Sequence, residues 1–297
     1  MSESQIACTI NTTECAIVRI KTSGITGYSL TACTTLPFGL GDITSGKGKR
    51  MLNKLGRYLK EWHNEDLALC IDPDIYFPLP AYFPDEASEV ECKKYCNIEA
   101  GYFLTHPEKY GCDLTSYCDN TSGESEEKRL LLFYPDEQCK KVAEHFSKNH
   151  RIVFSGSPQR PLVFLSKYTG DSQVILELEN NYVLLTISRN GRIEKFTCHQ
   201  VKSREEREYF AIKVLSDNPF GCETDLQITG IKADNVMMAL IGKETSINLT
   251  RLNIPQSIMI SNLEKYSVSS ASVVKAISTA LMALSEKRET IGDLYLF

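Results

Sequence analysis

The stretch that decides the fold is residues 173–199, QVILELENNYVLLTISRNGRIEKFTCH. Three runs of aliphatic and β-branched residues in it are separated by Asn180-Asn181 and by Asn190-Gly191, pairs that tolerate the positive φ angles of tight hairpin turns. The pattern predicts an antiparallel meander of three strands. The predicted strands are Gln173–Leu178, Tyr182–Ser188 and Ile193–His199.

The meander leads into alternating helix and strand signals. Ser203 and Glu206 have the spacing of a capping box, which predicts a helix that runs to about Leu215. A short apolar strand, Leu226–Thr229, then ends at Gly230, and a second helix is predicted to follow it. Antiparallel hairpins that lead into helix–strand–helix units indicate a mixed α/β fold.

The first half of the chain shows the same order of elements. Cys15–Lys21 and Ile25–Thr31 read as a hairpin, and an amphipathic helix around residues 51–62 precedes a strand at Leu67–Ile71. We therefore predict two lobes, 1–155 and 156–297, each a mixed sheet that starts with antiparallel hairpins and is flanked by helices. We further predict a glycine-rich loop over Gly39–Gly48 and a helix from Pro84 to Ala100.

Composition excludes several classes of protein. The chain has 297 residues and a formal net charge of −5, the wrong sign for a general nucleic-acid binder. No stretch approaches the 18 apolar residues of a membrane span, and the N-terminal residues do not resemble a secretion signal. We therefore expect a cytoplasmic protein whose eleven cysteines are free thiols.

One local charge cluster stands out against the negative total. It consists of Lys47, Lys49, Arg50, Lys54 and Arg57, which lie before and within the helix predicted around residues 51–62. The simplest interpretation of such a run is a solvated helix face.

No motif in the chain specifies a catalytic site. Residues 41–48 nearly match the phosphate-binding loop spacing, but Gly48 stands where the magnesium-binding hydroxyl belongs. Cys92 and Cys96 lie one helical turn apart and do not have the turn of a zinc knuckle. Cys198 and His199 are adjacent on a strand, so their side chains point to opposite faces and form no dyad.

The segment 174–235 resembles an uncharacterised bacterial protein family with an actin-like ATPase (ribonuclease H-like) fold. The similar features are the strand pair, the third strand, the charged helix and the strand end LQITG at residues 226–230. Residues 15–30, CAIVRIKTSGITGYSL, and residues 91–104, ECKKYCNIEAGYFL, resemble the same family. The resemblance implies a distant relation to the actin-like proteins of pilus assembly and secretion, and to sugar and pantothenate kinases.

The resemblance also implies where a nucleotide would bind. Members of this fold hold phosphates with one hairpin turn in each lobe, each led by an aspartate. The matching first turn is Thr22-Ser23-Gly24-Ile25-Thr26, and the strand before it contains no carboxylate. The matching second turn is residues 177–181, where Glu177 and Glu179 could bind magnesium but are expected to lie on the surface.

The adenosine contact implied by the resemblance needs two adjacent glycines. Gly230 is present, but Ile231 occupies the second place. We therefore expect a non-enzymatic scaffold or assembly protein without cofactor or metal. Its expected partner is a protein of an envelope-associated assembly, or a second copy of the chain, and not a nucleic acid. The alternative is a nucleotide-dependent kinase or ATPase that binds ATP and magnesium through divergent residues. Those residues are Thr22, Ser23, Gly24, Glu177, Glu179 and Gly230.

Overall fold

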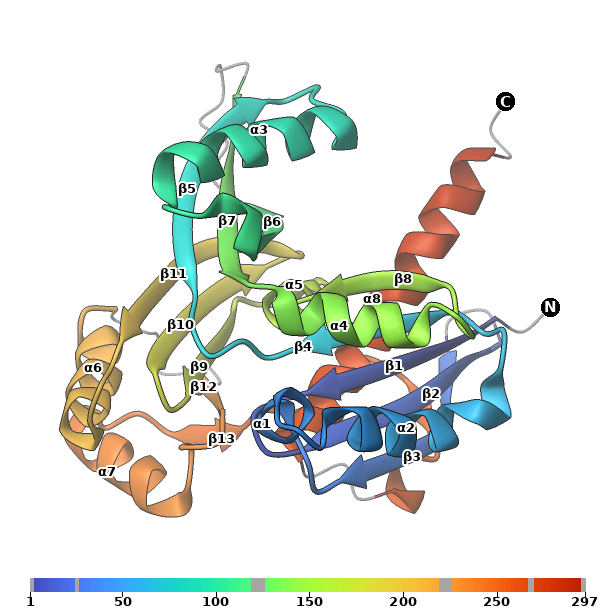
Figure 1. Ribbon diagram of the computed structural model, residues 1–297. Coiled ribbons are helices and arrows are strands. Elements are labelled where there is room, and N and C mark those ends of the chain that lie inside the picture. Colours follow the sequence, from blue (N-terminus) through green and yellow to red (C-terminus); the bar gives the residue numbers. More distant parts are fainter. Residues whose placement is uncertain (1–2, 25–26, 119–125, 219–225, 267–269, 295–297) are drawn as a thin grey trace. The chain divides into compact units, whose positions relative to one another are not determined.

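The computed structural model describes residues 3–24, 27–118, 126–218, 226–266 and 270–294 (Figure 1). The chain forms two compact units, each assembled from separated stretches of sequence. Unit 1 comprises Met1–Pro73, Asp136–Leu162 and Ile254–Phe297, and unit 2 comprises Asp74–Pro135 and Val163–Asn253.

Unit 1 is built on a six-stranded mixed sheet with the order β14-β3-β2-β1-β4-β8. Antiparallel pairing joins β1 to β2 and β2 to β3, whereas β4 is parallel to both β1 and β8. The strands are β1 (Ser4–Ile10), β2 (Cys15–Ser23), β3 (Gly27–Leu36), β4 (Leu67–Ile71), β8 (Ile152–Gly156) and β14 (Ile260–Ser261).

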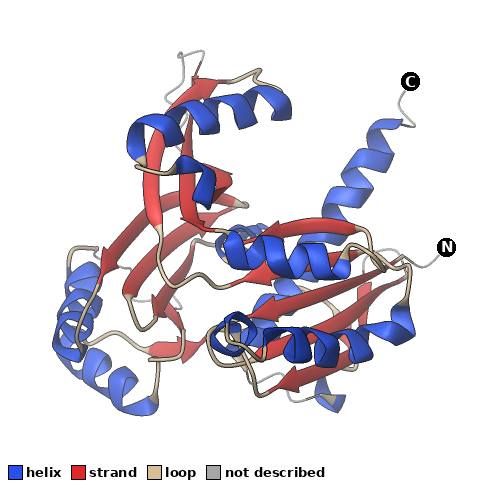
Figure 2. Cartoon of the chain, viewed as in Figure 1, coloured by secondary structure: helices blue, strands red, loops and turns tan. Residues whose placement is uncertain are grey.

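Helices cover both faces of this sheet (Figure 2). The C-terminal helix α8 (Ala271–Leu294) packs against β1, β2 and β4. The helices α2 (Gly48–Leu59) and α4 (Glu137–Phe146) contact each other, and α4 also packs on β4 and β8. The five residues of β4 are all buried, as is usual for a parallel strand that is covered on both faces.

Unit 2 contains a five-stranded sheet with the order β11-β10-β9-β12-β13. One face of this sheet carries Val174, Leu176, Leu178, Val183 and Leu185, which form an apolar core with helices α6 (Arg204–Ser216) and α7 (Asn235–Thr245). The strands are β9 (Gln173–Leu178), β10 (Tyr182–Arg189), β11 (Arg192–Gln200), β12 (Leu226–Thr229) and β13 (Leu249–Arg251).

A second, three-stranded antiparallel sheet in unit 2 has the order β5-β7-β6, and helix α3 (Glu89–Phe103) packs on it. Its strands are β5 (Phe77–Pro84), β6 (Tyr110–Ser116) and β7 (Glu126–Pro135). The three prolines of β5 are tolerated because β5 is an edge strand, where a missing backbone N–H can face away from the ladder.

The remaining helices are short. They are α1 (Leu40–Thr44), α5 (Gln159–Leu165), η1 (Lys60–Trp62), η2 (Pro107–Lys109), η3 (Ser166–Tyr168) and η4 (Leu263–Lys265). In the stretches that the structure describes, no helix has the length and apolar character needed to cross a bilayer.

The predicted meander is confirmed, but its two turns differ. Asn190 and Gly191 have φ angles of 52° and 76°, as expected for the favoured hairpin turn. Asn180 and Asn181 also form the predicted tight turn, in which the amide of Glu179 donates to the carbonyl of Tyr182, but neither residue has a positive φ. The helix predicted from Pro84 to Ala100 is present as α3, but its predicted start was wrong. Strand β5 continues to Pro84, and α3 starts only after Ser88, whose side chain forms a capping box with Glu91.

Two stretches of the first unit also differ from the sequence analysis. The N-terminal strand β1 was not predicted, although it lies in the middle of the sheet. The predicted loop over Gly39–Gly48 contains the short helix α1, and Gly48 is the first residue of α2.

The compact units do not follow the predicted lobes, 1–155 and 156–297. Helix α8 packs on strands of the N-terminal sheet and so joins unit 1. The segment Asp74–Pro135 groups with the second sheet, because β6 and β11 are in contact. A single boundary in the middle of the sequence cannot describe a C-terminal helix that belongs to the first unit, or a segment of the first half that belongs to the second.

The packing of α8 on the N-terminal sheet gives a testable prediction. Ile277 is fully buried in α8, so Ile277→Ala should lower the free energy of unfolding by about 2–5 kcal/mol through lost burial and the cavity left behind. The matched control is Val236→Ala on α7, which is 65% exposed and should change stability by less than about 0.5 kcal/mol. Urea unfolding measures both, and equal effects would contradict the packing described for α8.

Candidate functional site

A ligand-binding site in unit 1 is expected at the edge of the sheet that is formed by the carboxyl ends of its parallel strands. Strands β1, β4 and β8 run parallel, so Ile10, Ile71 and Gly156 end at the same edge of the sheet. In open α/β sheets, ligands bind in the crevice outside these carboxyl ends. A phosphate-binding turn in unit 1 is therefore expected at this edge.

The turn predicted from the sequence lies at the opposite edge. The backbone amide of Thr22 donates to the carbonyl of Glu3, and Lys21 pairs with Ser4 at the amino end of β1. Gly24 has a φ of 68°, as a turn requires, while Ile25 and Thr26 lie outside the described residues. Thr22, Ser23 and Gly24 are thus brought together, but away from the carboxyl ends of β1 and β4.

The turn at the expected edge is residues 11–14, between β1 and β2, and the sequence analysis missed it because it missed β1. Asn11 holds this turn through its own side chain. Its Oδ1 accepts hydrogen bonds from the backbone amides of Thr13, at 2.8 Å, and Glu14, at 2.6 Å. Its Nδ2 donates to Ser272 Oγ at 2.9 Å. The Asn-Thr-Thr sequence was the available signal, since Asn side chains commonly form such turns.

Neighbouring segments close over this turn. The backbone amide of Leu40 donates to the carbonyl of Asn11 at 2.8 Å. Gly39 lies so close that a Cβ atom there would overlap the backbone of Asn11, Thr12 and Thr13. Ser270, just before α8, hydrogen-bonds the carboxylate of Glu14. Glycine is required at position 39 by this close backbone approach.

A buried ion pair stands beside the turn, directly after β4. The Nζ atom of Lys275 on α8 lies 2.6 Å from Oδ2 of Asp72, and the side chains are 2% and 4% exposed. The amide of Asp72 also donates to the carbonyl of Ile10, which fixes the carboxylate at the end of β1. Lys275 therefore compensates the charge of Asp72, one of the carboxylates at this edge.

The corresponding edge of unit 2 holds the second group of predicted residues. Strand β9 is parallel to β12, so Glu177 and Glu179 lie at the same edge as Thr229 and Gly230. The expectation that these carboxylates lie on the surface was wrong, because Glu177 is fully buried and Glu179 is 6% exposed. Both faces of β9 are covered, so alternation along the strand exposes neither.

Glu179 serves as an internal hydrogen-bond acceptor at this edge. Its Oε1 accepts from the backbone amide of Ile231 at 3.2 Å. Gly230 has a φ of 100°, and a Cβ atom on it would overlap the backbone of Leu178. The amide of Lys232 donates to the carbonyl of Leu178. Gly230 thus lets the loop after β12 pack closely on β9.

Arg207 on α6 fixes the turn between β9 and β10. Its Nε donates to the carbonyl of Glu179 and its Nη2 to that of Asn180, both at 2.8 Å. The amide of Val201 donates to the carbonyl of Asn181. The guanidinium is buried, so it stiffens the turn rather than facing solvent.

The five-stranded sheet also carries a cysteine, Cys198, whose thiol is a poor nucleophile at neutral pH. Cys198 lies on β11, opposite Leu184, which in turn pairs with Glu177. Burial, together with the negative charge of Glu177, raises the pKa of the Cys198 thiol to about 12. The thiolate needed for attack is therefore scarce at pH 7.

At the carboxyl end of the parallel strands in each unit, backbone amides already donate hydrogen bonds to side chains of the same unit. The amides of Thr13 and Glu14 in unit 1 and of Ile231 in unit 2 donate to side chains of this protein. Nucleotide phosphates are usually held by such backbone amides. These three amides are therefore already engaged in hydrogen bonds with side chains of this protein.

Neither protein-family models nor curated protein sequences match this chain significantly. Solved structures do. A structure titled "PilM-PilN type IV pilus biogenesis complex" superposes with a TM-score of 0.71 at 11% identity, covering 94% of this chain and 98% of that one. The chain has the actin-like ATPase fold. The predicted fold class is confirmed, and so is the predicted resemblance to a pilus-assembly protein, as a likeness of fold.

Two further structures of this fold cover nearly the whole chain. One is a Bacteroides thetaiotaomicron protein described as having an actin-like ATPase fold and unknown function, with a TM-score of 0.49, 11% identity, and 93% and 95% of the two chains covered. The other is the ethanolamine utilization protein EutJ from Carboxydothermus hydrogenoformans, with a TM-score of 0.48, 9% identity, and 94% and 89% covered.

The buried pair Lys275–Asp72 gives a prediction about stability. Lys275→Met leaves a buried carboxylate without its cation and should lower the free energy of unfolding by about 3–5 kcal/mol. The double variant Asp72→Asn, Lys275→Met removes both charges and should recover part of that loss. Chemical denaturation at neutral pH measures the three proteins.

The control is Lys141→Met, which breaks an exposed pair with Glu137 and should cost less than about 1 kcal/mol. A cost for Lys275→Met as small as that of the control would show that the pair at the end of β4 is solvated, contrary to the structure.

Proposed function

We propose that this chain is a non-enzymatic protein of the actin-like ATPase fold that serves as a scaffold or assembly component. It acts by binding a protein partner and not by turning over a nucleotide. The observation that carries the proposal is the use of backbone amides at both strand edges by Asn11 and Glu179.

The chemistry of unit 1 supports loss of nucleotide binding. A magnesium–phosphate group needs free hard oxygens and free N–H donors close together. Asp72 is paired with Lys275, and the amides of Thr13 and Glu14 are paired with Asn11. Gly39 and Leu40 close over the same turn. A phosphate would have to displace several internal bonds at once.

The likeness to the PilM-PilN complex supports a protein partner. That structure matches this chain over nearly its whole length, and its title names a complex in type IV pilus biogenesis. We extend this to a cytoplasmic protein of a bacterial cell that joins an envelope-associated assembly. Pairing with a second copy of the chain stays a prediction, as does the absence of a cofactor.

One observation favours the alternative, a nucleotide-dependent kinase or ATPase. Glu177, one residue before the end of β9, carries a fully buried carboxylate and pairs with Thr229, beside Gly230 with its positive φ. A buried carboxylate at a strand end is a common position for a catalytic or metal-binding group. Nucleotide binding is therefore the property to test.

Thermal unfolding with ATP and magnesium distinguishes the two functions. A ligand that binds only the native state stabilises it by RT ln(1 + [L]/Kd), about 2.7 kcal/mol at a hundredfold excess over Kd. We expect millimolar ATP with magnesium to leave the melting temperature of the wild-type protein unchanged. The control is Glu177→Gln, which should behave in the same way.

The outcome that contradicts the proposal is a rise in melting temperature with ATP and magnesium that disappears in Glu177→Gln. A tagged full-length chain purified from its native cells supplies the second test. The proposal expects a protein partner in a fixed molar ratio, and a protein recovered alone under mild, cross-linked conditions would contradict the scaffold role.

A further inference from the structure

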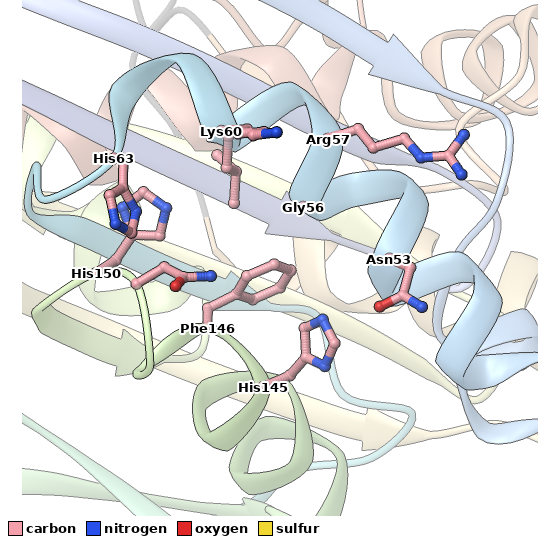
Figure 3. Close-up of a pocket in the computed structure, with 10 residues that line it drawn as sticks. Asn53, Gly56, Arg57, Lys60, His63, His145, Phe146 and His150 are labelled. Atoms are coloured by element: carbon pink, nitrogen blue, oxygen red, sulfur yellow. The ribbon is translucent and has the colours of Figure 1, made fainter.

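A pocket of about 680 Å³ lies between α2 and α4 in unit 1 (Figure 3). Helix α2 and the residues that follow it supply Arg57, Lys60 and His63, and the end of α4 supplies His145 and Phe146. Figure 3 shows the rings of Phe146 and His145 between the two helices, and the side chains of Arg57 and Lys60 extending from α2 and the residue that follows it. The pocket is not at either of the strand edges described above.

The described residues that line this pocket include basic side chains and no acidic ones. Among the described residues that line it, every ionisable group is a lysine, an arginine or a histidine, and none is a carboxylate. Arg57 and Lys60 are exposed, and no ion pair is formed by either within the described part of the chain. By contrast, Lys140 and Lys141 of α4 pair with Asp136 and Glu137, one turn earlier.

Two further lysines, Lys148 and Lys49, add positive charge near His145 of the pocket. Burial, and then the charges of Lys148 and Lys49, lower the pKa of His145. Lys49 belongs to the basic run that the sequence analysis interpreted as a solvated helix face. At least one member of that run thus acts on the pocket, in a chain whose total charge is negative.

The pocket is held in a fixed shape by groups at one end. His150 is buried and its Nδ1 lies 3.0 Å from the carbonyl of Glu65. The amide of Asn64 donates to the carbonyl of Asn149, and the rings of His63 and His150 meet edge to face at 6.3 Å. Gly56 of α2 lies close to Phe146, since a Cβ atom at this position would be in ordinary van der Waals contact with the ring at 3.6 Å.

We propose that the pocket between α2 and α4 binds a phosphate-bearing anion through Arg57 and Lys60. A guanidinium gives two parallel N–H donors that match phosphate oxygens, and an ammonium adds a compact charge for a dianion. The same chemistry is offered by a free diphosphate and by the phosphomonoester headgroup of a lipid.

Binding of inorganic pyrophosphate to the full-length protein, measured by calorimetry at constant ionic strength, tests this site. Arg57→Glu combined with Lys60→Glu should weaken binding by about tenfold or more, because both charge-assisted contacts are lost. The matched control is Lys93→Glu combined with Lys94→Glu on α3, two exposed residues of unit 2, which should leave the affinity unchanged.

A second variant distinguishes binding in the pocket from attraction by the positive charges on the surface of α2. Asn53→Phe places a ring in the exposed mouth of the pocket while it keeps every charge, and should abolish binding. Circular dichroism and the melting temperature confirm that each variant is folded. Undiminished pyrophosphate binding by Asn53→Phe would overturn the proposal, since charge alone would then suffice.

A parallel arm identifies the source of the anion. Vesicles of phosphatidylcholine with phosphatidic acid are compared with vesicles of phosphatidylcholine alone in a flotation assay. Pyrophosphate binding without flotation supports a free phosphate ligand, and flotation that the Arg57, Lys60 variant loses supports a lipid headgroup. No binding in either arm, or binding equal in both charge variants, would overturn the proposal.

Discussion

The hydrogen bonds from backbone amides to Asn11 and Glu179 are the constraint on which the chemistry of this protein depends. Asn11 accepts from Thr13 and Glu14 at the end of β1, and Glu179 accepts from Ile231 beside the end of β12. Each acceptor is tethered to the chain, so it competes with a free ligand at a high effective concentration. A phosphate gains nothing at these amides unless it first breaks a bond already made.

These bonds belong to a larger set of contacts that brings distant segments together. Helix α8 reaches back to the first sheet, where Ser272 bonds Asn11 and Lys275 pairs with Asp72. In unit 2, Arg207 holds the turn after β9, and Gly230 allows the neighbouring loop to pack on it. The turns at both edges are thereby held in place by other segments of the same unit.

The sequence predicted the fold where local signals were strong. The meander was found because each apolar run is bounded by Asn-containing turns, and the start of α6 was found from Ser203, whose Oγ accepts from the amide of Glu206. Strand β1 was missed because its polar members do not alternate outward: Gln5 and Thr9 are both fully buried. A strand covered on both faces carries no period-two pattern.

The site was less predictable, for a physical reason. The pair Asp72–Lys275 joins residues 203 positions apart, and its meaning appears only once α8 is seen on the sheet. The turn at residues 11–14 could not be chosen without β1. Glu177 and Glu179 were correctly placed on one face, but their burial depends on the coverage of β9, which tertiary packing alone determines.

Amide NMR spectra recorded with and without ATP and magnesium test the central claim most directly. If Asn11 and Glu179 keep their bonds, the resonances of the Thr13, Glu14 and Ile231 amides should remain where they are as nucleotide is added. Movement of all three to new positions at saturating nucleotide would show that phosphate replaces the internal acceptors, and would contradict it.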